Sequence, residues 1–236
     1  MLKLSIRRPR AAACGPVLRA AMFFAAAALA AGCASVYPSR VELEYLPSQF
    51  YNPVVGAAGV AVRVEVRDQR SDQIDVGQTL DSNGKESAPI TIKNDVDYVL
   101  QKSMEKALAM RGFDIAANAP VSVNLELSQF YTTFQPNWHA GVAHATLVMN
   151  AQIVARDGAV TFYQTVSGEG GRNDQNLTGD NRAAGLDQAL SRAVNNLADR
   201  QDFQHAILYA DRLRPVPVPI ASPAAAPGSS SIAPPR

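Results

Sequence analysis

Three charged residues, Asp68, Arg70 and Asp72, follow directly after a run in which apolar and polar residues alternate. Charged side chains spaced two apart at the end of a strand can form a polar rim that binds a partner, and loops in such positions often carry function. The same residues can instead serve the fold, as an ion pair and a turn cap that close the strand end. The sequence leaves both interpretations open.

Residue types that perform catalysis or bind metals occur without a recognised spacing. His139 and His144 lie five apart, so they would face opposite sides of a continuous strand, and His205 falls in a separate helical stretch. The zinc spacing His-x-x-x-His and the nucleophile motif Gly-x-Ser-x-Gly do not occur. Residues 168–171, Gly-Glu-Gly-Gly, lack the Gly-Lys-Ser/Thr ending of a phosphate-binding loop and predict a flexible loop. We therefore expect no enzymatic activity, no cofactor and no metal.

The thiol of Cys33 is the remaining reactive group, and its surroundings predict lipidation. Residues 1–19 carry five basic and no acidic side chains, and residues 20–31 are apolar. A helix of twelve residues rises ~18 Å, too little to cross a bilayer, so residues 1–32 predict a cleaved signal peptide. The end of this segment resembles the bacterial lipobox, in which the cysteine receives a diacylglycerol and becomes the first residue. Ala30 departs from the leucine preferred at its position, and plain secretion with a free Cys33 is the alternative.

The other cysteine and the residue after Cys33 extend this prediction. Cys14 lies within the predicted signal peptide, so the mature chain keeps a single cysteine, and lipidation accounts for an unpaired cysteine in an exported protein. Ala34 follows Cys33, where aspartate would be expected for retention in the inner membrane of a diderm bacterium. We therefore expect a lipid anchor in the outer membrane, with the domain facing the periplasm.

The charge of the mature chain excludes one class of partner. Without residues 1–32 the chain has 17 Lys and Arg against 21 Asp and Glu, a net charge of −4. Nucleic acids bind basic surfaces, so we expect no nucleic-acid partner. Docking on anionic lipids by charge is also excluded.

Periodicity predicts the elements of a single folded domain. Strands with alternating apolar residues are expected over 60–67, 121–128, 143–153 and 160–166, a short strand over 41–45, and a hairpin around Asn83-Gly84. Helices are expected from an Asn94 cap to Gly112, and over 182–209. The fold class is therefore α+β, with a mixed, mostly antiparallel sheet of about four to six strands and two helices on one face, in the order β-α-β-β-β-α.

Four segments make up the predicted organisation. They are a signal peptide over 1–32, a lipidated N-terminus and spacer over 33–56, a globular α+β domain over 57–210, and a Pro/Ala-rich disordered tail over 211–236.

An ordered set of short strings resembles one known family, the YajG-like envelope lipoproteins of Gram-negative bacteria. The strings are Val66–Gln73, Val99–Lys106, Met110–Phe113 and Val121–Tyr131. No single string is specific, but together they extend over most of the predicted domain. The resemblance implies an envelope lipoprotein without an assigned activity, so it supplies no catalytic or cofactor residues.

Three hypotheses for the function follow. The first is a non-enzymatic, lipid-anchored periplasmic protein that binds a protein partner in envelope maintenance or transport, with Asp68, Arg70 and Asp72 as candidate contacts. The second is a carrier of a small ligand or lipid, such as an accessory subunit of an envelope ABC transport system, an analogy at the level of the fold. The third is an unrecognised hydrolase.

Overall fold

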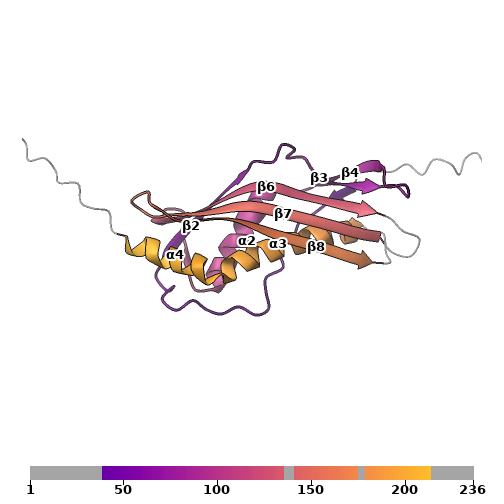
Figure 1. Cartoon of the computed structure of the whole chain (residues 1–236). Coiled ribbons are helices and arrows are strands. Elements are labelled where there is room, and N and C mark those ends of the chain that lie inside the picture. Colours follow the sequence, from indigo (N-terminus) through magenta and orange to yellow (C-terminus); the bar gives the residue numbers. More distant parts are fainter. Residues whose placement is uncertain (1–38, 136–140, 175–178, 214–236) are drawn as a thin grey trace, which may run out of the picture. The chain divides into compact units, whose positions relative to one another are not determined.

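The computed structural model describes residues 39–135, 141–174 and 179–213, which form one α+β domain (Figure 1). In chain order the elements are β1 (Ser39–Val41), β2 (Ala61–Asp68), β3 (Asp75–Leu80), β4 (Glu86–Ile92), α2 (Val96–Met110), β5 (Asp114–Ile115), β6 (Val121–Gln135), β7 (Gly141–Val154), β8 (Val160–Asp174), α3 (Gly179–Asp199) and α4 (Gln201–Arg212).

The eight strands form one sheet built around β6. On one side β6 pairs with β7, and β7 pairs with β8, both antiparallel. On its other side the first half of β6 pairs in parallel with β2, where Val62–Asp68 face Val121–Leu127. The second half pairs in parallel with β3, where Gly77–Thr79 face Thr132–Phe134. Because β6 is 15 residues long, it can hold two strands end to end along one edge.

The expectation of a mixed sheet is confirmed, but the predicted strand number and pairing need correction. The sheet has eight strands instead of four to six. The antiparallel arrangement holds for β6–β7–β8 and β3–β4, whereas β1–β4, β2–β5, β2–β6 and β3–β6 are parallel. The crossover through α2 makes β6 parallel to β2. The strands β1 and β5 have only three and two residues, too few for an alternating pattern to be recognised.

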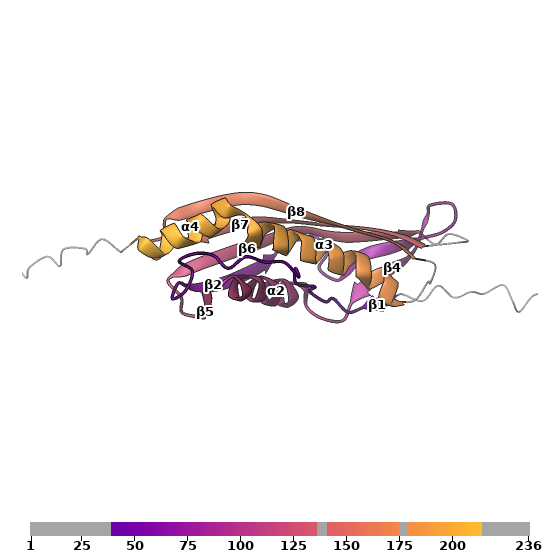
Figure 2. The ribbon, with the colours of Figure 1, turned by 90° about the horizontal axis from the view of Figure 1, so that it is seen from below.

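The helices α2 and α3 cover one face of the sheet, as predicted (Figure 2). Leu100 and Met104 of α2 and Leu190 of α3 are fully buried, as are Leu147 and Met149 of β7. Each such side chain contributes ~1.5–3 kcal/mol of hydrophobic stabilisation. None of the described helices has the length and apolar character that crossing a bilayer requires.

The predicted final helix over 182–209 is two helices, so the described residues contain three in all. Arg200 has an extended backbone and separates α3 from α4. After this break, Phe203 packs edge-on against Phe162 of β8, with ring centroids 5.3 Å apart. The break lets α4 follow the sheet, and no proline or glycine marks it in the sequence.

The segment around Gly168 and Gly170 is a strand, so the predicted flexible loop over 168–171 is wrong. These glycines belong to β8, which continues to Asp174. A Cβ atom at Gly168 would overlap the backbone of Ala189 and Ala193, and one at Gly170 would overlap the carbonyl oxygen of Gly185. The glycines therefore allow α3 to approach β8 closely, a use of glycine that resembles a loop in the sequence.

Residues 39–56, which we call the strap, pack against the domain, although we expected them to belong to a spacer. The strap lies between α2 and α3 (Figure 2), with Val41 and Leu43 buried. Three side chains spaced four apart on α3 bind it. They are Asp187, which accepts the Glu44 N–H at 2.8 Å, Ser191, which accepts the Leu46 N–H at 2.9 Å, and Asn195, which accepts the Tyr45 hydroxyl at 2.6 Å.

Asn94 also holds the strap, so the prediction that Asn94 caps the helix is wrong. The helix α2 begins at Val96, and its cap residue Asp95 makes no side-chain capping bond. The amide of Asn94 instead accepts the Leu43 N–H at 3.1 Å and donates to the Leu43 carbonyl at 3.0 Å. Leu43 and Asn94 lie 51 positions apart, so a local sequence pattern cannot indicate this contact and predicts a helix cap at Asn94 instead.

Candidate functional site

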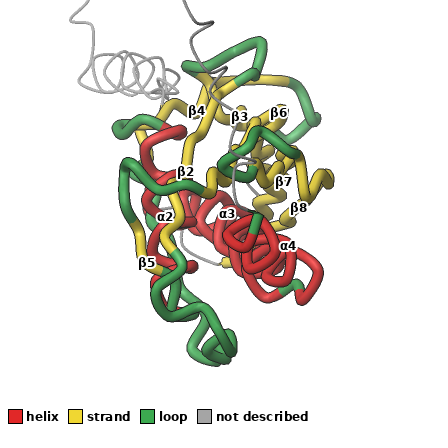
Figure 3. Tube along the Cα trace, turned by 90° about the vertical axis from the view of Figure 1, so that its left-hand side faces the viewer, coloured by secondary structure: helices red, strands yellow, loops and turns green. Residues whose placement is uncertain are grey.

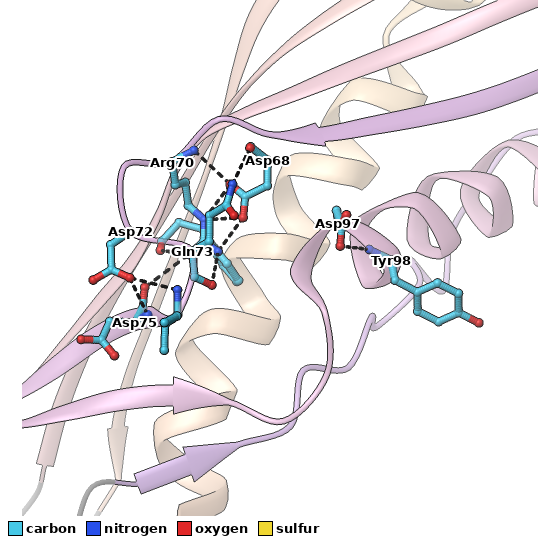
Figure 4. A network of polar contacts seen from close by, with 9 residues as sticks. Asp68, Arg70, Asp72, Gln73, Asp75, Asp97 and Tyr98 are labelled. Carbon is cyan, nitrogen blue, oxygen red and sulfur yellow. Dashed lines mark hydrogen bonds and ion pairs between the residues drawn. The ribbon is translucent and has the colours of Figure 1, made fainter.

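Asp68 and Arg70 form a buried ion pair at the end of β2 (Figure 4). The Arg70 Nη2 lies 2.7 Å from Asp68 Oδ2, and the Arg70 Nε lies 3.0 Å from Asp68 Oδ1. The Arg70 backbone N–H also donates to Oδ1, at 3.0 Å. The side chain of Arg70 is only 5% exposed. Burial and this two-pronged geometry make the pair a fixed part of the fold.

Arg70 also holds the loop that follows it. Its Nη2 donates to the Gln73 carbonyl at 3.3 Å, and its Nη1 donates to the carbonyls of Asp75 and Phe130, both at 3.4 Å. The Gln73 side chain in turn donates to the Asp68 carbonyl at 2.9 Å. We call residues 69–75 the rim loop. The Arg70 side chain is directed inward, so it does not contact a partner itself. It fixes the position of the rim loop, which lies at the surface.

Asp72 lies on the same loop but faces solvent. Its Oδ1 accepts the backbone N–H groups of Ile74 at 2.9 Å and Asp75 at 3.0 Å. The hydrogen bonds from Asp75 and Ile74 hold the pKa of Asp72 below its ordinary value, so it is charged at neutral pH. The structure thus brings the three predicted residues together at the end of β2, with the side chains of Asp68 and Arg70 buried and Asp72 at the surface of the rim loop.

Ile74 is a feature of the rim loop that the sequence analysis missed. Its side chain is 73% exposed, although isoleucine is among the residues most often buried. Residues of the loop line two grooves, of about 500 and 540 Å³. The first is lined by Asp68, Gln73, Ile74 and residues 92–97, and the second by Asp72, Asp75, Gly77, Gln78, residues 86–89 and Tyr131.

The second groove is acidic. Asp72, Asp75 and Glu86 contribute its charged side chains. Burial raises the pKa of Tyr131, and the negative charges of Glu86, Asp75 and Asp72 raise it further. A groove of this charge favours a partner that carries basic side chains.

The strap forms another groove, which sequence reasoning did not find. Arg111, at the end of α2, is 1% exposed, and its Nε donates to Asp199 Oδ1 at 3.0 Å. The nearby hydroxyl of Tyr45 is half-buried, and burial raises its pKa to about 12. A groove of about 810 Å³ lies between residues 49–55 and the junction of α3 and α4, with Asp199 at its wall. Arg111 and Asp199 lie 88 positions apart in the sequence, which explains why no local pattern indicated this pair.

The other chemically reactive residues are not assembled into a site. His144 is exposed on β7 and His205 is exposed on α4, while His139 lies outside the described residues. Within residues 39–135, 141–174 and 179–213, no group of three His, Cys, Asp or Glu could hold a metal ion. Cys33, the predicted lipidation site, also lies outside the described residues.

The described residues thus define an α+β domain whose candidate site is a polar surface loop. Residues 53–207 match the family Lipoprotein_16, described as "Uncharacterized lipoprotein", and the chain belongs to this family of bacterial lipoproteins. This membership confirms the resemblance inferred from the sequence. No catalytic activity is known for the family, and its members are lipoproteins of the bacterial envelope.

Curated relatives agree with this assignment over part of the chain. The chain is 33% identical over 104 residues to the uncharacterized lipoprotein YajG of Escherichia coli K12, and equally to YajG of E. coli O6:H1. This region is 43% of the present chain and 50% of each relative, so the match spans about half the length of these proteins.

Solved structures show more distant likeness. Protein XCC0632 from Xanthomonas campestris has 16% sequence identity and a TM-score of 0.49, over 71% of this chain and 96% of that one. Lipoprotein GNA1162 from Neisseria meningitidis has 12% identity and a TM-score of 0.32, over 50% of this chain and 88% of that one.

Proposed function

We propose that this protein is a non-enzymatic lipoprotein, anchored through Cys33 in the outer membrane with its domain in the periplasm. Its rim loop binds a protein partner in envelope maintenance or transport. The lipobox-like sequence around Cys33 supports the anchor, and membership of a lipoprotein family supports it independently. The alanine at position 34 favours the outer membrane.

The observation that carries the partner-binding proposal is the exposure of Ile74 on a loop that a buried ion pair holds in place. An exposed apolar side chain on a mobile loop would lose much of its binding free energy to ordering of that loop. Arg70 bonds the backbone at three positions, so the rim loop is ordered before binding. Asp72 and the acidic groove beside it add a charge that selects basic partners.

A small-ligand carrier would need a cavity between the sheet and the helices. At that interface the side chains of Leu147, Leu186 and Leu190 are buried in contact with the rest of the core. No observation on the described residues favours this alternative over the rim loop.

Site-directed photo-crosslinking in cells tests the proposal. A photoreactive amino acid replaces Ile74 in one strain and Tyr163, which is 60% exposed on β8, in the control strain. We expect a discrete crosslinked protein from position 74 only, and its yield should fall when Asp72→Lys is introduced. Equal crosslinking from both positions, or none from position 74, would contradict a partner site at the rim loop.

A further inference from the structure

One part of the strap presents an unusual concentration of exposed apolar side chains. We call residues 46–56 the tip segment. Leu46, Phe50, Tyr51 and Val55 are all exposed, and Phe50 and Val55 reach 86% and 93%. Four of the nine most exposed large apolar side chains of the described residues thus fall within ten positions. No Asp, Glu, Lys or Arg occurs from Leu46 to Val62.

The tip segment is held in this form by specific bonds. The Ser48 hydroxyl donates to the Phe50 carbonyl at 2.7 Å and accepts the Phe50 N–H at 3.2 Å. The Val54 N–H donates to the carbonyl of Arg111 at 2.9 Å. A turn from Val54 to Ala57 then places Val55 at its apex. The fold therefore keeps these apolar side chains on the surface, and such a patch marks an interaction site.

The length of chain before β1 indicates what this surface meets. Five residues separate Cys33 from Ser39, the first residue of the strap. At ~3.3–3.6 Å for each residue, this connection spans ~20 Å at full extension, so a lipid on Cys33 keeps the start of the strap near the bilayer. From there the strap continues along the side of the molecule that is turned toward the viewer in Figure 2.

The composition of the tip segment suits a lipid surface. Aromatic and aliphatic side chains partition into the interfacial region of a bilayer, and the tip segment itself carries no charged residue, although Asp199 lines the groove beside it. A protein that carries a lipid needs such a second contact to take up a defined orientation, because a single flexible anchor leaves it free to rotate. A protein partner in the periplasm would have to compete for the tip segment with the membrane, which the anchor keeps close.

We propose that the tip segment inserts Phe50, Tyr51 and Val55 into the membrane that holds the lipid of Cys33, and so orients the domain. This inference rests on the proposed function, because the anchor brings the strap to the bilayer. The loop that follows β1 lies along the lower side of the molecule in Figure 1, although β1 itself pairs with β4, and the connection between β2 and β3, which contains the rim loop, lies on the upper side. In the end view of Figure 3, a loop extends below β5 and α4, and other loops lie above, around β3 and β4. Insertion of the tip segment therefore directs the rim loop away from the membrane.

Tryptophan fluorescence on the acylated full protein tests this contact. The single tryptophan is removed by Trp138→Phe, and one reporter is introduced by Phe50→Trp, Val55→Trp or, as a control, Tyr163→Trp. Phe162 packs against α4, so Tyr163 faces the opposite side of the sheet. Each protein is reconstituted into vesicles of phosphatidylethanolamine and phosphatidylglycerol, with and without brominated phosphatidylcholine.

We expect brominated lipid to lower the emission of the reporters at positions 50 and 55 by about twofold, and to leave that at position 163 unchanged. Having two reporters protects the test against misfolding of one variant. If the protein floats with the vesicles but neither reporter is quenched, the membrane contact of the tip segment is wrong and the anchor stands. If the acylated preparation does not float, the anchor itself is refuted, and the inference falls with it.

Discussion

The side-chain amide of Asn94 bonds the backbone of Leu43 in both directions, as a neighbouring strand would. The donor and acceptor distances are 3.0 and 3.1 Å. Through this contact the entry to α2 fixes the strap, and with it the first described residues after the predicted lipid anchor. The strap is therefore part of the domain, and its attachment can be measured.

Asn94→Ala should lower the free energy of unfolding by ~1–2 kcal/mol, because it removes two partly buried hydrogen bonds. Asn94→Asp keeps only the acceptor and should also destabilise the domain. The matched control is Asn196→Ala on the exposed side of α3, where the change should cost nothing. Urea denaturation of the three variants provides the measurement, and equal stability of Asn94→Ala and Asn196→Ala would disprove this role.

The Arg111–Asp199 pair should respond unequally to loss of its two members. Asp199→Ala leaves a guanidinium that is 1% exposed without its carboxylate, and such losses cost ~3–5 kcal/mol. Arg111→Met leaves Asp199, whose side chain is about half exposed, so water can solvate it and we expect ~1–2 kcal/mol. The double variant should be more stable than Asp199→Ala. If Arg111→Met lost more stability than Asp199→Ala, the unpaired buried charge of Arg111 would not be the main cause of the destabilisation.

Asp187 should make the stability of the strap depend on pH. Burial and the nearby Glu44 raise its pKa from 3.8 to about 6, although the Glu44 N–H bond acts in the opposite direction. The folded state thus binds the proton more tightly than the unfolded state. The contribution of this group is fully present below pH 3.8 and is lost as pH rises through about 6.

Asp187→Asn tests this dependence, because the amide oxygen can still accept the Glu44 N–H. The variant should be more stable than the wild type by ~1 kcal/mol at about pH 8, a figure reduced because Asp187 is only half-buried. The difference should shrink as pH falls below about 6 and disappear below pH 3.8, where both states are protonated. Unfolding of both proteins is measured at about pH 8 and below pH 3.8. If the difference in stability between them did not change with pH, Asp187 would not have the raised pKa.

The close approach of α3 to β8 predicts different outcomes for two neighbouring glycines. Gly170→Ala should destabilise the domain by ~1–3 kcal/mol, because its Cβ would overlap the Gly185 carbonyl oxygen. Gly171→Ala is the control, since its Cβ would lie 3.6 Å from the nearest atom, the Ala143 carbonyl oxygen. Thermal unfolding that ranks the two variants equally would show that the helix can move away from the strand without cost.

Most elements with a regular sequence period were predicted with the correct type, although β6 and β8 continue to Gln135 and Asp174, and the short strand predicted over 41–45 ends at Val41. In the strands β2, β6 and β7, buried residues alternate with less buried ones over most of the length, and the Asn83-Gly84 turn joins β3 to β4 as expected. Gly112 has a φ of +96° just after α2, which agrees with its predicted place at the helix end. These features depend on local residue preferences, which a single sequence contains.

Features that depend on distant contacts were missed. Asn94 bonds a residue 51 positions away, so its predicted helix cap was wrong. Gly168 and Gly170 look like loop residues because the helix that requires them lies further along the chain. At the candidate site, the sequence indicated Asp68, Arg70 and Asp72 as candidate contacts, but it could not show that the Arg70 side chain is directed inward. The exposure of Ile74 follows from that packing and was not predictable.

The proposed function requires a lipid on Cys33 that attaches this domain to a membrane. Mass spectrometry of the N-terminal peptide, together with fractionation of cells that express the wild type or Cys33→Ser, tests this attachment. We expect a mature chain that begins at an acylated Cys33 and sediments with membranes, and a Cys33→Ser variant that is released into the soluble fraction. An unacylated Cys33 in the mature wild type, or equal sedimentation of both proteins, would contradict this attachment.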